Sequence, residues 1–297
     1  MQFLAPAKIN MALRIVGRRA DGYHLLWTVM SFFPLYDRLS IRCPAEQLQL
    51  VCDPPVTSDP ERNLAWRAAR CLQEESGARH GAHIHLRKRI PHGAGLGGGS
   101  SDAATVLLAL NRLWNVHLPH RRLLQIGLQL GADVPFFLGG EAALAEGVGE
   151  RLTPLPQLAT AELVVVHPGV TLSTGEVFQQ WHRTATPAPP GTAPLRLPEP
   201  HTESLLPLLV NDLQDTATRM APVVAELAQA LRREGAQATL MSGSGSSLFG
   251  VFAKREEAEG AAGRLRNDHP EWRVYCGRTF NKHPFANDWK SAIRGVG

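Results

Sequence analysis

The chain has 297 residues, of which 44% are hydrophobic and 20% charged. This length exceeds what a single hydrophobic core usually holds, and the composition is that of an ordinary globular protein, so we expect two domains that need no metal ions or disulfides to fold. The formal net charge of +4 is small and the basic residues are scattered, which disfavours a nucleic-acid-binding protein and suits an enzyme with polyanionic substrates.

Strands dominate the start of the sequence. We predict strands at Lys8–Val16 and Leu25–Leu35, and a further strand at His83–Arg89, where apolar and polar residues partly alternate.

Three helices are predicted in the first half. Apolar residues recur at helical spacing in Asn63–Glu75, Ser101–Trp114 and Pro119–Leu130. We expect capping residues to open the second helix and Gly131 to end the third. The basic clusters Arg87–Arg89 and His120–Arg122 are interpreted as solvated faces.

After residue 150 the pattern restarts, which predicts a boundary between residues 1–150 and 151–297 in a protein of the α+β class. The expected strands and helices are, in chain order, Glu162–His167, Pro222–Glu234 (helix), Ala238–Met241, Ser247–Phe252, Arg255–Asn267 (helix) and Trp272–Phe280. The six prolines in Thr184–Ser204 predict an extended loop there.

The sequence has no feature typical of export or membrane insertion. No apolar run approaches the roughly 20 residues needed to cross a bilayer. Met1–Leu13 lacks the basic and apolar regions of a secretory signal. The spacing of Cys43, Cys52, Cys71 and Cys276 fits neither a zinc ribbon nor a redox pair. We therefore expect a cytoplasmic protein with reduced thiols and no membrane partner.

The most informative segment is a glycine-rich loop followed directly by a predicted helix. Glycines let the backbone approach a ligand closely, and the free amides and positive dipole end of a helix bind anions. The segment therefore predicts a binding site for the phosphates of ATP. Its residues are Pro91, His92, Gly93, Ala94, Gly95, Leu96, Gly97, Gly98, Gly99, Ser100 and Ser101.

Three better-known glycine loops fit this segment poorly. A P-loop needs a lysine before its serine or threonine, whereas Ser100 follows Gly99 directly. A dinucleotide-binding fold needs an acidic residue about 20 positions later for the ribose, and none occurs between Asp102 and Asp133. The HRD and DFG segments of protein kinases are also missing from the sequence.

The loop resembles the second motif of the kinase superfamily named for galactokinase, homoserine kinase, mevalonate kinase and phosphomevalonate kinase. Pro6–Asn10 resembles the first motif of that superfamily, and Met241–Ser247 resembles the third, a glycine loop near the active site. Four further segments narrow the resemblance to the family of kinases that phosphorylate 4-diphosphocytidyl-2-C-methyl-D-erythritol: Arg19–His24, Gly131–Phe137, Glu146–Glu150 and His167–Val170.

The resemblance extends from about residue 5 to about residue 255. It implies an N-terminal half like domain 2 of ribosomal protein S5 and a ferredoxin-like C-terminal half. It also implies an ATP-dependent small-molecule kinase that phosphorylates the 2-hydroxyl of its cytidine diphosphate substrate, in non-mevalonate isoprenoid precursor biosynthesis. For such an enzyme we expect a monomer or weak homodimer without a nucleic-acid partner.

Two residues are expected to carry the chemistry. Asp133 stands at the position of the catalytic aspartate in the family, where it would deprotonate or orient the acceptor hydroxyl. Lys8 would stabilise the negative charge of that aspartate and lower the barrier to hydroxyl attack. Asn10 is expected to bind the substrate near the same hydroxyl.

The acceptor end of the site is assigned from the resemblance alone. Tyr23 and Phe178 match the positions that sandwich the cytosine, His24 the position that binds its edge, and Thr174 a polar substrate contact. The alternative for Phe178, less favoured, is a core aromatic residue, and Asp21–Gly22 is expected to form a turn that positions Tyr23.

Magnesium is expected with a triphosphate and a diphosphate substrate. No carboxylate cage for it is visible in the sequence, so we assign no protein metal ligands, although Ser100 and Ser101 could bind phosphate or Mg²⁺. Asp102 puts a negative charge in the first helical turn, where it suits the helix dipole but lies near the phosphates. It is given no role.

Three rival interpretations are weighed. Another kinase of the superfamily is disfavoured by Tyr23–His24 and by Gly131–Phe137. A nucleotide sensor without catalysis is disfavoured by the presence of both Lys8 and Asp133. RNA binding through the S5-like half rests on fold analogy alone.

Overall fold

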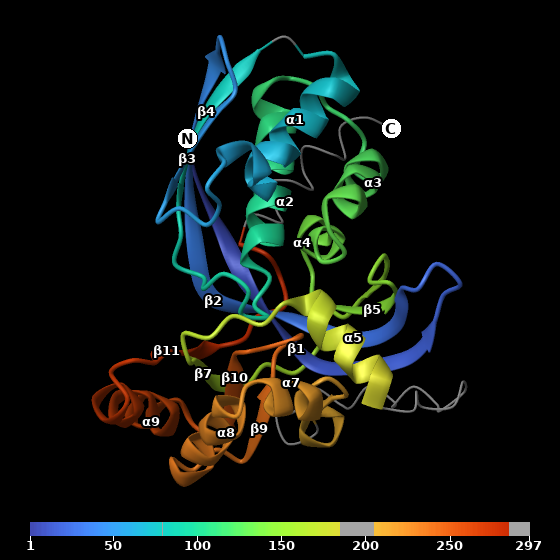
Figure 1. The fold of residues 1–297 in the computed structure, drawn as a ribbon. Coiled ribbons are helices and arrows are strands. Elements are labelled where there is room, and N and C mark those ends of the chain that lie inside the picture. The colour runs from blue at the N-terminus through green and yellow to red at the C-terminus, as the bar shows by residue number, and fades with distance from the viewer. Residues whose placement is uncertain (79, 185–204, 285–297) are drawn as a thin grey trace.

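The computed structural model describes residues 1–78, 80–184 and 205–284. The described chain forms four layers, in the order helices, sheet, sheet, helices (Figure 1). Two of its three hydrophobic clusters lie between a sheet and its helices, and the third lies between the two sheets. That third cluster joins Ile9 and Phe33 of one sheet to Val165 and Phe249 of the other.

The first sheet is built on a long antiparallel hairpin of β1 (Gln2–Arg18) and β2 (His24–Ala45). Its strand order is β3-β4-β2-β1-β8, with β5 paired to β2 and β6 paired to β5. The remaining strands are β3 (Gln49–Asp53), β4 (Gly81–Arg87), β5 (Ala143–Gly147), β6 (Arg151–Pro154) and β8 (Val210–Asn211).

Four helices cover one face of this sheet (Figure 1): α1 (Leu64–Ser76), α2 (Gly98–Leu113), α3 (His120–Leu130) and α4 (Val134–Gly139). The central helix, α2, is rich in alanine and leucine, and nearly all of its side chains from Ser101 to Leu110 are buried. It can be buried on several sides because α1, α3 and α4 all pack around it. A single 3₁₀ turn, Pro60–Arg62, precedes α1.

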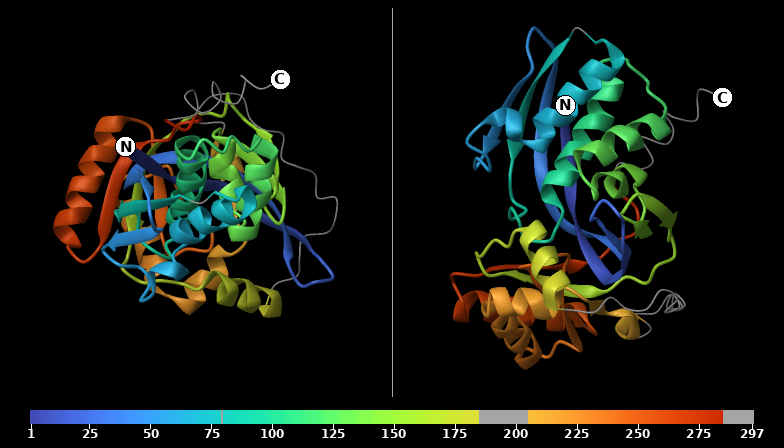
Figure 2. Two further views of the ribbon diagram at one scale, coloured as in Figure 1. Left: turned by 90° about the horizontal axis from the view of Figure 1, so that it is seen from above. Right: turned by 45° about the vertical axis from the view of Figure 1, so that its right-hand side comes forward.

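The second sheet has the order β11-β7-β10-β9, and all of its pairs are antiparallel. Its strands are β7 (Glu162–His167), β9 (Ala238–Met241), β10 (Leu248–Phe252) and β11 (Arg273–Arg278). Helices α8 (Val223–Arg233) and α9 (Arg255–Asp268) cover its outer face, as the right view in Figure 2 shows. Helix α5 (Thr174–Thr184), the 3₁₀ turn Leu206–Leu208 and helix α7 (Gln214–Met220) complete this half.

The predicted helices and strands are present, with two kinds of difference. Strands β1 and β2 are longer than predicted, because β1 already starts at Gln2 and β2 continues to Ala45 through a stretch in which buried and more exposed residues alternate. Several short elements gave no clear sequence signal, namely β3, α4, β5, β6, α5, β8 and α7. The prediction of a loop at Thr184–Ser204 falls almost entirely outside the described residues.

The proposed boundary near residue 150 stays a prediction. Two strands from beyond that residue, β6 and β8, belong to the first sheet. The pairing of β8 with β1 is parallel, and it places Asn211 beside Leu13. The C-terminal part of the chain thus contributes to the sheet that carries the N-terminal strand.

Candidate active site

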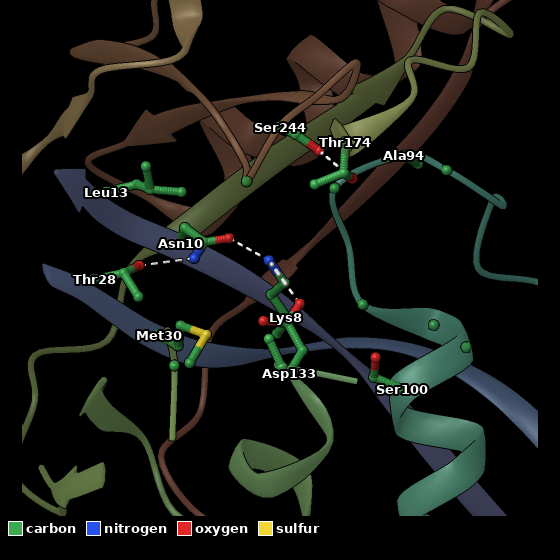
Figure 3. A pocket seen from close by; sticks show the side chains of 18 of the residues that line it. Lys8, Asn10, Leu13, Thr28, Met30, Ala94, Ser100, Asp133, Thr174 and Ser244 are labelled. Carbon is green, nitrogen blue, oxygen red and sulfur yellow. Dashed lines mark hydrogen bonds and ion pairs between the residues drawn. The ribbon is translucent and has the colours of Figure 1, made fainter. Parts of the chain in front are cut away.

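Lys8 and Asn10 project from the same face of β1, because they are two residues apart on a strand (Figure 3). The Lys8 ammonium donates to Asn10 Oδ1 and lies 3.4 Å from Asp133 Oδ2. The Asn10 amide is oriented by its other end, where Nδ2 donates to Thr28 Oγ1 at 2.8 Å. Both β1 side chains are almost fully buried, so the ammonium is surrounded by protein and has one carboxylate within ion-pair distance.

The strand is irregular at this point. The register of β1 against β2 shifts between Asn10 and Ala12, which leaves Met11 without a direct partner. Such bulges are common beside active sites, where they redirect side chains. Asn10 is thereby directed to the cavity while Met11 is buried between the two sheets.

The glycine loop lies against β1 and requires residues without a side chain. A Cβ on Gly95, whose φ is +74°, would lie 1.9 Å from the carbonyl oxygen of Ser242. One on Gly97, with φ of +70°, would lie 2.8 Å from Lys8 Cγ. The loop is also bonded to β1 directly, since the Lys8 amide donates to Leu96 O at 2.9 Å.

Helix α2 begins inside the glycine-rich segment, at Gly98, three residues before the predicted start. Its N-cap is Gly97, and no side chain caps it, so the prediction that capping residues open this helix is wrong. The reason is that Gly97 adopts the left-handed conformation and starts the helix earlier. Ser100 then faces the cavity in the first turn, whereas Ser101 is fully buried beneath it.

The start of α2 presents free amides to the cavity. Ser101 N–H donates to Gly97 O at 2.9 Å, so the amides of Gly98, Gly99 and Ser100 have no partner within the helix. These three residues line the cavity. Together with the dipole of a 16-residue helix, they form a site for an anion such as a phosphate.

Asp133 is held between two helices. Helix α3 ends at Leu130 with Gly131 as its C-cap, as predicted, and Asp133 is the N-cap residue of α4. Helix α4 is anchored by Phe136 and Phe137, both fully buried, the former stacked on Phe32 at 4.7 Å between ring centroids. The Asp133 side chain keeps 38% of its surface exposed, so it can meet both Lys8 and a ligand.

The turn between β5 and β6 packs against Ala132, the residue before this aspartate. Gly149 packs so closely on Ala132 that a Cβ there would lie 3.2 Å from the Ala132 carbonyl oxygen. The turn is braced internally, since Glu150 Oε2 accepts from the Val148 amide at 2.6 Å. Val148 and Gly149 line the cavity beside Asp133, which gives Glu146–Glu150 its place in the site.

A third segment, Met241–Ser247, joins the first two. The Ser242 hydroxyl donates to Gly95 O at 2.9 Å and accepts from the backbone amide of Asn10 at 3.2 Å. It therefore connects the glycine loop to β1. Ser244 Oγ lies 2.8 Å from Thr174 Oγ1, which fixes this segment to α5 as well (Figure 3).

These segments enclose a cavity of about 350 Å³. Of the residues singled out from the sequence, its lining includes Lys8, Asn10, Pro91, His92, Gly93, Ala94, Gly95, Gly97, Gly98, Gly99, Ser100, Asp133, Thr174 and Phe178. Leu96, Ser101, Tyr23 and His24 do not line it. Leu96 and Ser101 are buried under the loop, and the other two lie on the hairpin end of β1 and β2.

The cavity is also lined by Leu13, Leu26, Thr28, Thr174 and Phe178. His24 stacks on Phe178 with ring centroids 5.1 Å apart and so lies one layer behind the lining. Burial, and then the nearby Arg18 and His182, lower the pKa of His24, which keeps it neutral at pH 7.

Tyr23 lies at the exposed tip of the hairpin, with 66% of its surface accessible. The turn before it has the expected form, because Arg19 N donates to Tyr23 O at 2.7 Å and Gly22 N to Arg19 O at 3.0 Å. The cytosine sandwich of Tyr23 and Phe178 stays a prediction.

A buried charge cluster supports the loop from behind. The Lys88 ammonium lies 2.5 Å from Asp37 Oδ2 and 2.7 Å from Asp102 Oδ2, and all three side chains are almost fully buried. Asp37 Oδ1 also accepts from the amides of Arg89 and Ile90. The interpretation of Arg87–Arg89 as a solvated face is therefore wrong for Lys88, which is required inside to neutralise the carboxylates.

Asp102 points away from the phosphate site, toward this cluster. Burial raises the pKa of Asp102 to about 8, because the attraction of Lys88 is offset in part by the repulsion of Asp37. Two carboxylates thus share one ammonium, and both burial and the repulsion of Asp37 disfavour the charged form of Asp102.

A second cavity, also of about 350 Å³, lies on the other side of Pro91–His92 and shares Lys88 with the first. His167 and Arg273 line its far wall. His167 Nδ1 lies 3.3 Å from Ser247 Oγ, and burial, then Arg273, lower its pKa to about 4. This places His167–Val170 against the third segment, since Ser246 also donates to Val170 O.

Comparison with known proteins identifies the architecture. The chain matches the GHMP kinases N terminal domain over residues 63–141 and the GHMP kinases C terminal domain over residues 199–271. It is 46% identical over 255 residues to the 4-diphosphocytidyl-2-C-methyl-D-erythritol kinase of Chromobacterium violaceum, a match covering 86% of this chain and 87% of that protein. The chain belongs to the 4-diphosphocytidyl-2-C-methyl-D-erythritol kinase family.

Solved structures agree with this family. A crystal structure of 4-(cytidine 5'-diphospho)-2C-methyl-D-erythritol kinase matches with a TM-score of 0.76 and 39% identity, over 94% of this chain and 99% of that one. Homoserine kinase from Cytophaga hutchinsonii matches with a TM-score of 0.68 over 95% of each chain, but at 18% identity it shares the fold alone. The expected two-part kinase fold is confirmed.

Membership of the 4-diphosphocytidyl-2-C-methyl-D-erythritol kinase family makes the chain an ATP-dependent small-molecule kinase, as expected. Its four cysteines are free thiols. Within the described residues, no helix is both long and apolar enough to span a bilayer.

Three features of the site escaped the sequence interpretation. They are the Asp37–Lys88–Asp102 cluster, the packing of Gly149 on Ala132 beside Asp133, and the two hydrogen bonds that Asn211 Nδ2 donates to Met241 O and Gly243 O in the third segment. In the sequence, the signal for a structural role of Asn211 is weak: the polar pair Asn211–Asp212 precedes the apolar Leu213 after the proline-rich stretch.

Proposed function

We propose that this chain transfers the γ-phosphate of ATP to the 2-hydroxyl of 4-diphosphocytidyl-2-C-methyl-D-erythritol, with Lys8, Asn10 and Asp133 at the point of transfer. This reaction makes a precursor in non-mevalonate isoprenoid biosynthesis. The observation that carries the proposal is the Lys8–Asp133 pair, 3.4 Å apart, on the wall of the same cavity as the glycine loop.

Phosphoryl transfer needs an oriented hydroxyl and compensation of the charge on the transferred group. The Asp133 carboxylate accepts the proton of the acceptor hydroxyl, or orients it, from the exposed part of its side chain. The Lys8 ammonium, buried in a region of low polarity, stabilises negative charge beside it more strongly than it would in water. Asn10 keeps the ammonium in place through Oδ1.

The glycine loop and the start of α2 bind the phosphates of ATP. The free amides of Gly98, Gly99 and Ser100 and the Ser100 hydroxyl supply donors on one side of the cavity. Because the loop is bonded to β1 through Leu96 and to Ser242 through Gly95, its donors are fixed before the nucleotide binds. Fixed donors reorganise little during the reaction, which favours catalysis.

Magnesium accompanies the nucleotide in this proposal. The described residues contain no cluster of three or more histidine, cysteine or acidic side chains that could hold an ion, while Asp133 and Ser100 offer single oxygen donors to the cavity. This donor set fits an ion held mainly by phosphate oxygens. When bound, the ion neutralises charge on the phosphates.

At the acceptor end, Phe178 offers an aromatic face and Thr174 a hydroxyl, with Tyr23 and His24 beside them on the hairpin. An aromatic face and a few polar groups suit a nucleobase. We include in the proposal that the chain acts in the cytoplasm as a monomer or weak homodimer, and that it binds no nucleic acid. Its free cysteines support the location.

The test is a comparison of acceptors. The purified chain is assayed with ATP, Mg²⁺ and one of three acceptors: the cytidine substrate, homoserine or mevalonate. We expect a kcat/KM at least about a thousandfold higher for the cytidine substrate, because the buried polar groups of its site are left unpaired by the others. Preference for either of the other two acceptors would contradict the proposal.

Two rival functions are tested alongside. A sensor without catalysis would bind ATP but release no ADP at a rate above background with any acceptor. RNA binding is tested by a mobility-shift assay at low and high salt, in which measurable, salt-sensitive affinity would favour it. We expect turnover and no shift.

A further inference from the structure

Asn211 lies behind the third segment of the site, outside the cavity lining. It is 8% exposed and belongs to β8, the two-residue strand that pairs with β1. Both polar atoms of its side-chain amide are hydrogen-bonded, which fixes its orientation. Nδ2 donates to Met241 O at 2.7 Å and to Gly243 O at 2.8 Å, while Oδ1 accepts from the Leu213 amide at 2.9 Å. Both hydrogens of the amide are therefore used on one loop.

The loop that Asn211 holds contacts the reaction centre on its other side. A Cβ on Gly243, whose φ is +59°, would lie 3.1 Å from Lys8 Nζ and 3.3 Å from Asn10 Oδ1. Gly243 is thus packed between the Asn211 amide and the two site residues of β1. Any movement of its carbonyl toward or away from Asn211 changes the space available to the Lys8 ammonium.

Neighbouring residues fix Asn211 itself. Asp212 Oδ2 accepts from the Ile15 amide at 2.8 Å, and the Asp212 amide donates to Leu13 O at 3.0 Å. Gln214 Oε1 accepts from the Met241 amide at 2.8 Å. The segment Asn211–Gln214 is therefore bonded to β1 at one end and to the start of the third segment at the other.

We propose that Asn211 is a positioning residue for phosphoryl transfer, which acts by holding Gly243 against Lys8 and Asn10. It touches neither the cavity nor the reacting groups. The inference rests on the proposed function, since it assigns Asn211 a part in placing the Lys8 ammonium for that reaction. Misplacement of a reacting group by about 1 Å can lower a rate about a hundredfold.

The decisive variant is Asn211→Asp, which keeps the shape and removes the donors. Its carboxylate would face two carbonyl oxygens. We expect kcat to fall about 10- to 100-fold while the KM for ATP and for the acceptor each change less than about threefold, because the groups that contact the substrates are retained. A kcat within twofold of the wild type, in a folded variant, would overturn the proposal.

A pH profile separates positioning from a general structural role. A buried carboxyl that faces carbonyl oxygens gains its proton more readily than an exposed one, and the protonated form can donate one hydrogen to the loop. The ratio of Asn211→Asp to wild-type kcat should therefore rise as the pH falls from 9 to 6. A ratio that stays flat or falls in this range would count against the assignment.

The matched control is Asn111→Asp. Asn111 also binds a loop through both ends of its amide, with Nδ2 donating to Leu118 O at 3.1 Å and Oδ1 accepting from the Leu118 amide at 2.8 Å, and it does not line the cavity. We expect a lower Tm with kcat within twofold of the wild type. Equal losses of kcat in the two variants would overturn the proposal.

Asn211→Ser is a second test, which serves if Asn211→Asp does not fold. Its smaller side chain keeps one donor without adding a charge, and we expect an intermediate loss of kcat, about tenfold, in a protein with a single cooperative thermal transition. Unchanged kcat would overturn the proposal.

The proposed function and the role of Asn211 are tested by different measurements. If the wild type fails to phosphorylate the cytidine substrate, the proposed function is rejected. The role of Asn211 is judged only by the ratio of variant to wild-type kcat, measured with whichever acceptor the wild type uses.

Discussion

At one end of the cavity the walls are backbone, and at the other they are side chains. The phosphate end consists of the glycine loop, the amides of α2 and the third segment, Met241–Ser247, all bonded to β1 or to each other. The proposed acceptor end is lined by side chains of the hairpin of β1 and β2 and of helix α5, and Tyr23 lies outside this lining, at the exposed tip of the hairpin.

The difference indicates a division of tasks. Phosphates are recognised by charge and by many equivalent donors, so a rigid set of amides suffices. A specific acceptor needs particular side chains, and these can vary without disturbing the fold because they lie on a hairpin tip and on one face of a short helix. Changes at the phosphate end should therefore reduce the reaction with any acceptor, and changes at the acceptor end should reduce it selectively.

The largest effect is expected between the two ends. Asp133→Asn removes the carboxylate that meets the acceptor hydroxyl, and kcat should fall at least about a hundredfold while both substrates still bind. Steady-state kinetics and calorimetric titration of the acceptor measure the two quantities. Asp268→Asn, at an exposed position at the end of α9, is the control and should have wild-type kinetics. Near wild-type turnover for Asp133→Asn would contradict its assignment.

A backbone clash at the phosphate end should come next. In Gly95→Ala the new methyl would lie 1.9 Å from Ser242 O, and the residue would also have a positive φ. The loop must shift, so kcat/KM for ATP should fall about 10- to 100-fold, the scale of 1–3 kcal/mol of backbone strain.

Gly77→Ala is the control for the strain alone. Gly77 has a φ of +66° with no atom within 4 Å of its Cβ position, and it lies at the end of α1. It should lower the Tm without changing kinetics. If Gly95→Ala behaves in the same way, the loop tolerates movement and the phosphate end is less rigid than described.

At the acceptor end, Phe178→Ala should raise the KM for the cytidine substrate about tenfold and leave the KM for ATP unchanged, because a lost base–aromatic stack costs about 1–3 kcal/mol. Gln179→Ala, its exposed neighbour on α5, is the control. Equal changes in both KM values would mean that Phe178 supports the fold of the site instead of binding the base. This outcome would remove the proposed selectivity of the acceptor end.

The smallest effect on activity is expected at the charge cluster beneath the phosphate end, where the change is in stability. Asp102 has a folded-state pKa of about 8 against an ordinary value of 3.8. Its contribution to stability is therefore fully present below about pH 4 and is lost as the pH rises through 8. Asn at this position does not titrate, so the Tm of Asp102→Asn should rise relative to that of the wild type between pH 5 and pH 9, because the wild type loses about 1.4 kcal/mol for each pH unit over which only its folded state holds the proton.

This prediction is checked by thermal denaturation of both proteins at each pH. Activity at neutral pH should be unaffected, because Asp102 does not line the cavity. A constant difference in Tm across the range would show that Asp102 is ionised throughout and that the rigidity of the loop depends on its charge.

The sequence was informative where function depends on local patterns. Gly95, Gly97 and the start of α2 belong to one continuous segment, so their chemistry could be predicted without the fold. Lys8 and Asp133 are far apart in the chain, and only the family resemblance brought them together before the structure did so at 3.4 Å.

What escaped prediction depends on contacts across the chain. Lys88 looked like part of a basic surface cluster, because nothing in its neighbourhood shows that Asp37 and Asp102 lie next to it. Asn211 is similar, since its partners Met241 and Gly243 are about 30 residues away and joined to it only by tertiary structure. Helix α5 was missed because it begins with polar residues and glycine.

The hydrogen bonds of the Ser242 hydroxyl determine when the site can form during synthesis of the chain. It joins residues 10, 95 and 242, so the nucleotide site is incomplete until the last of them has been synthesised. The same holds for β1, whose edge receives β8 only when residues 210–211 are available. Contacts of such long sequence separation form late in folding. A growing chain thus carries the whole glycine loop and Lys8 well before it can act on ATP.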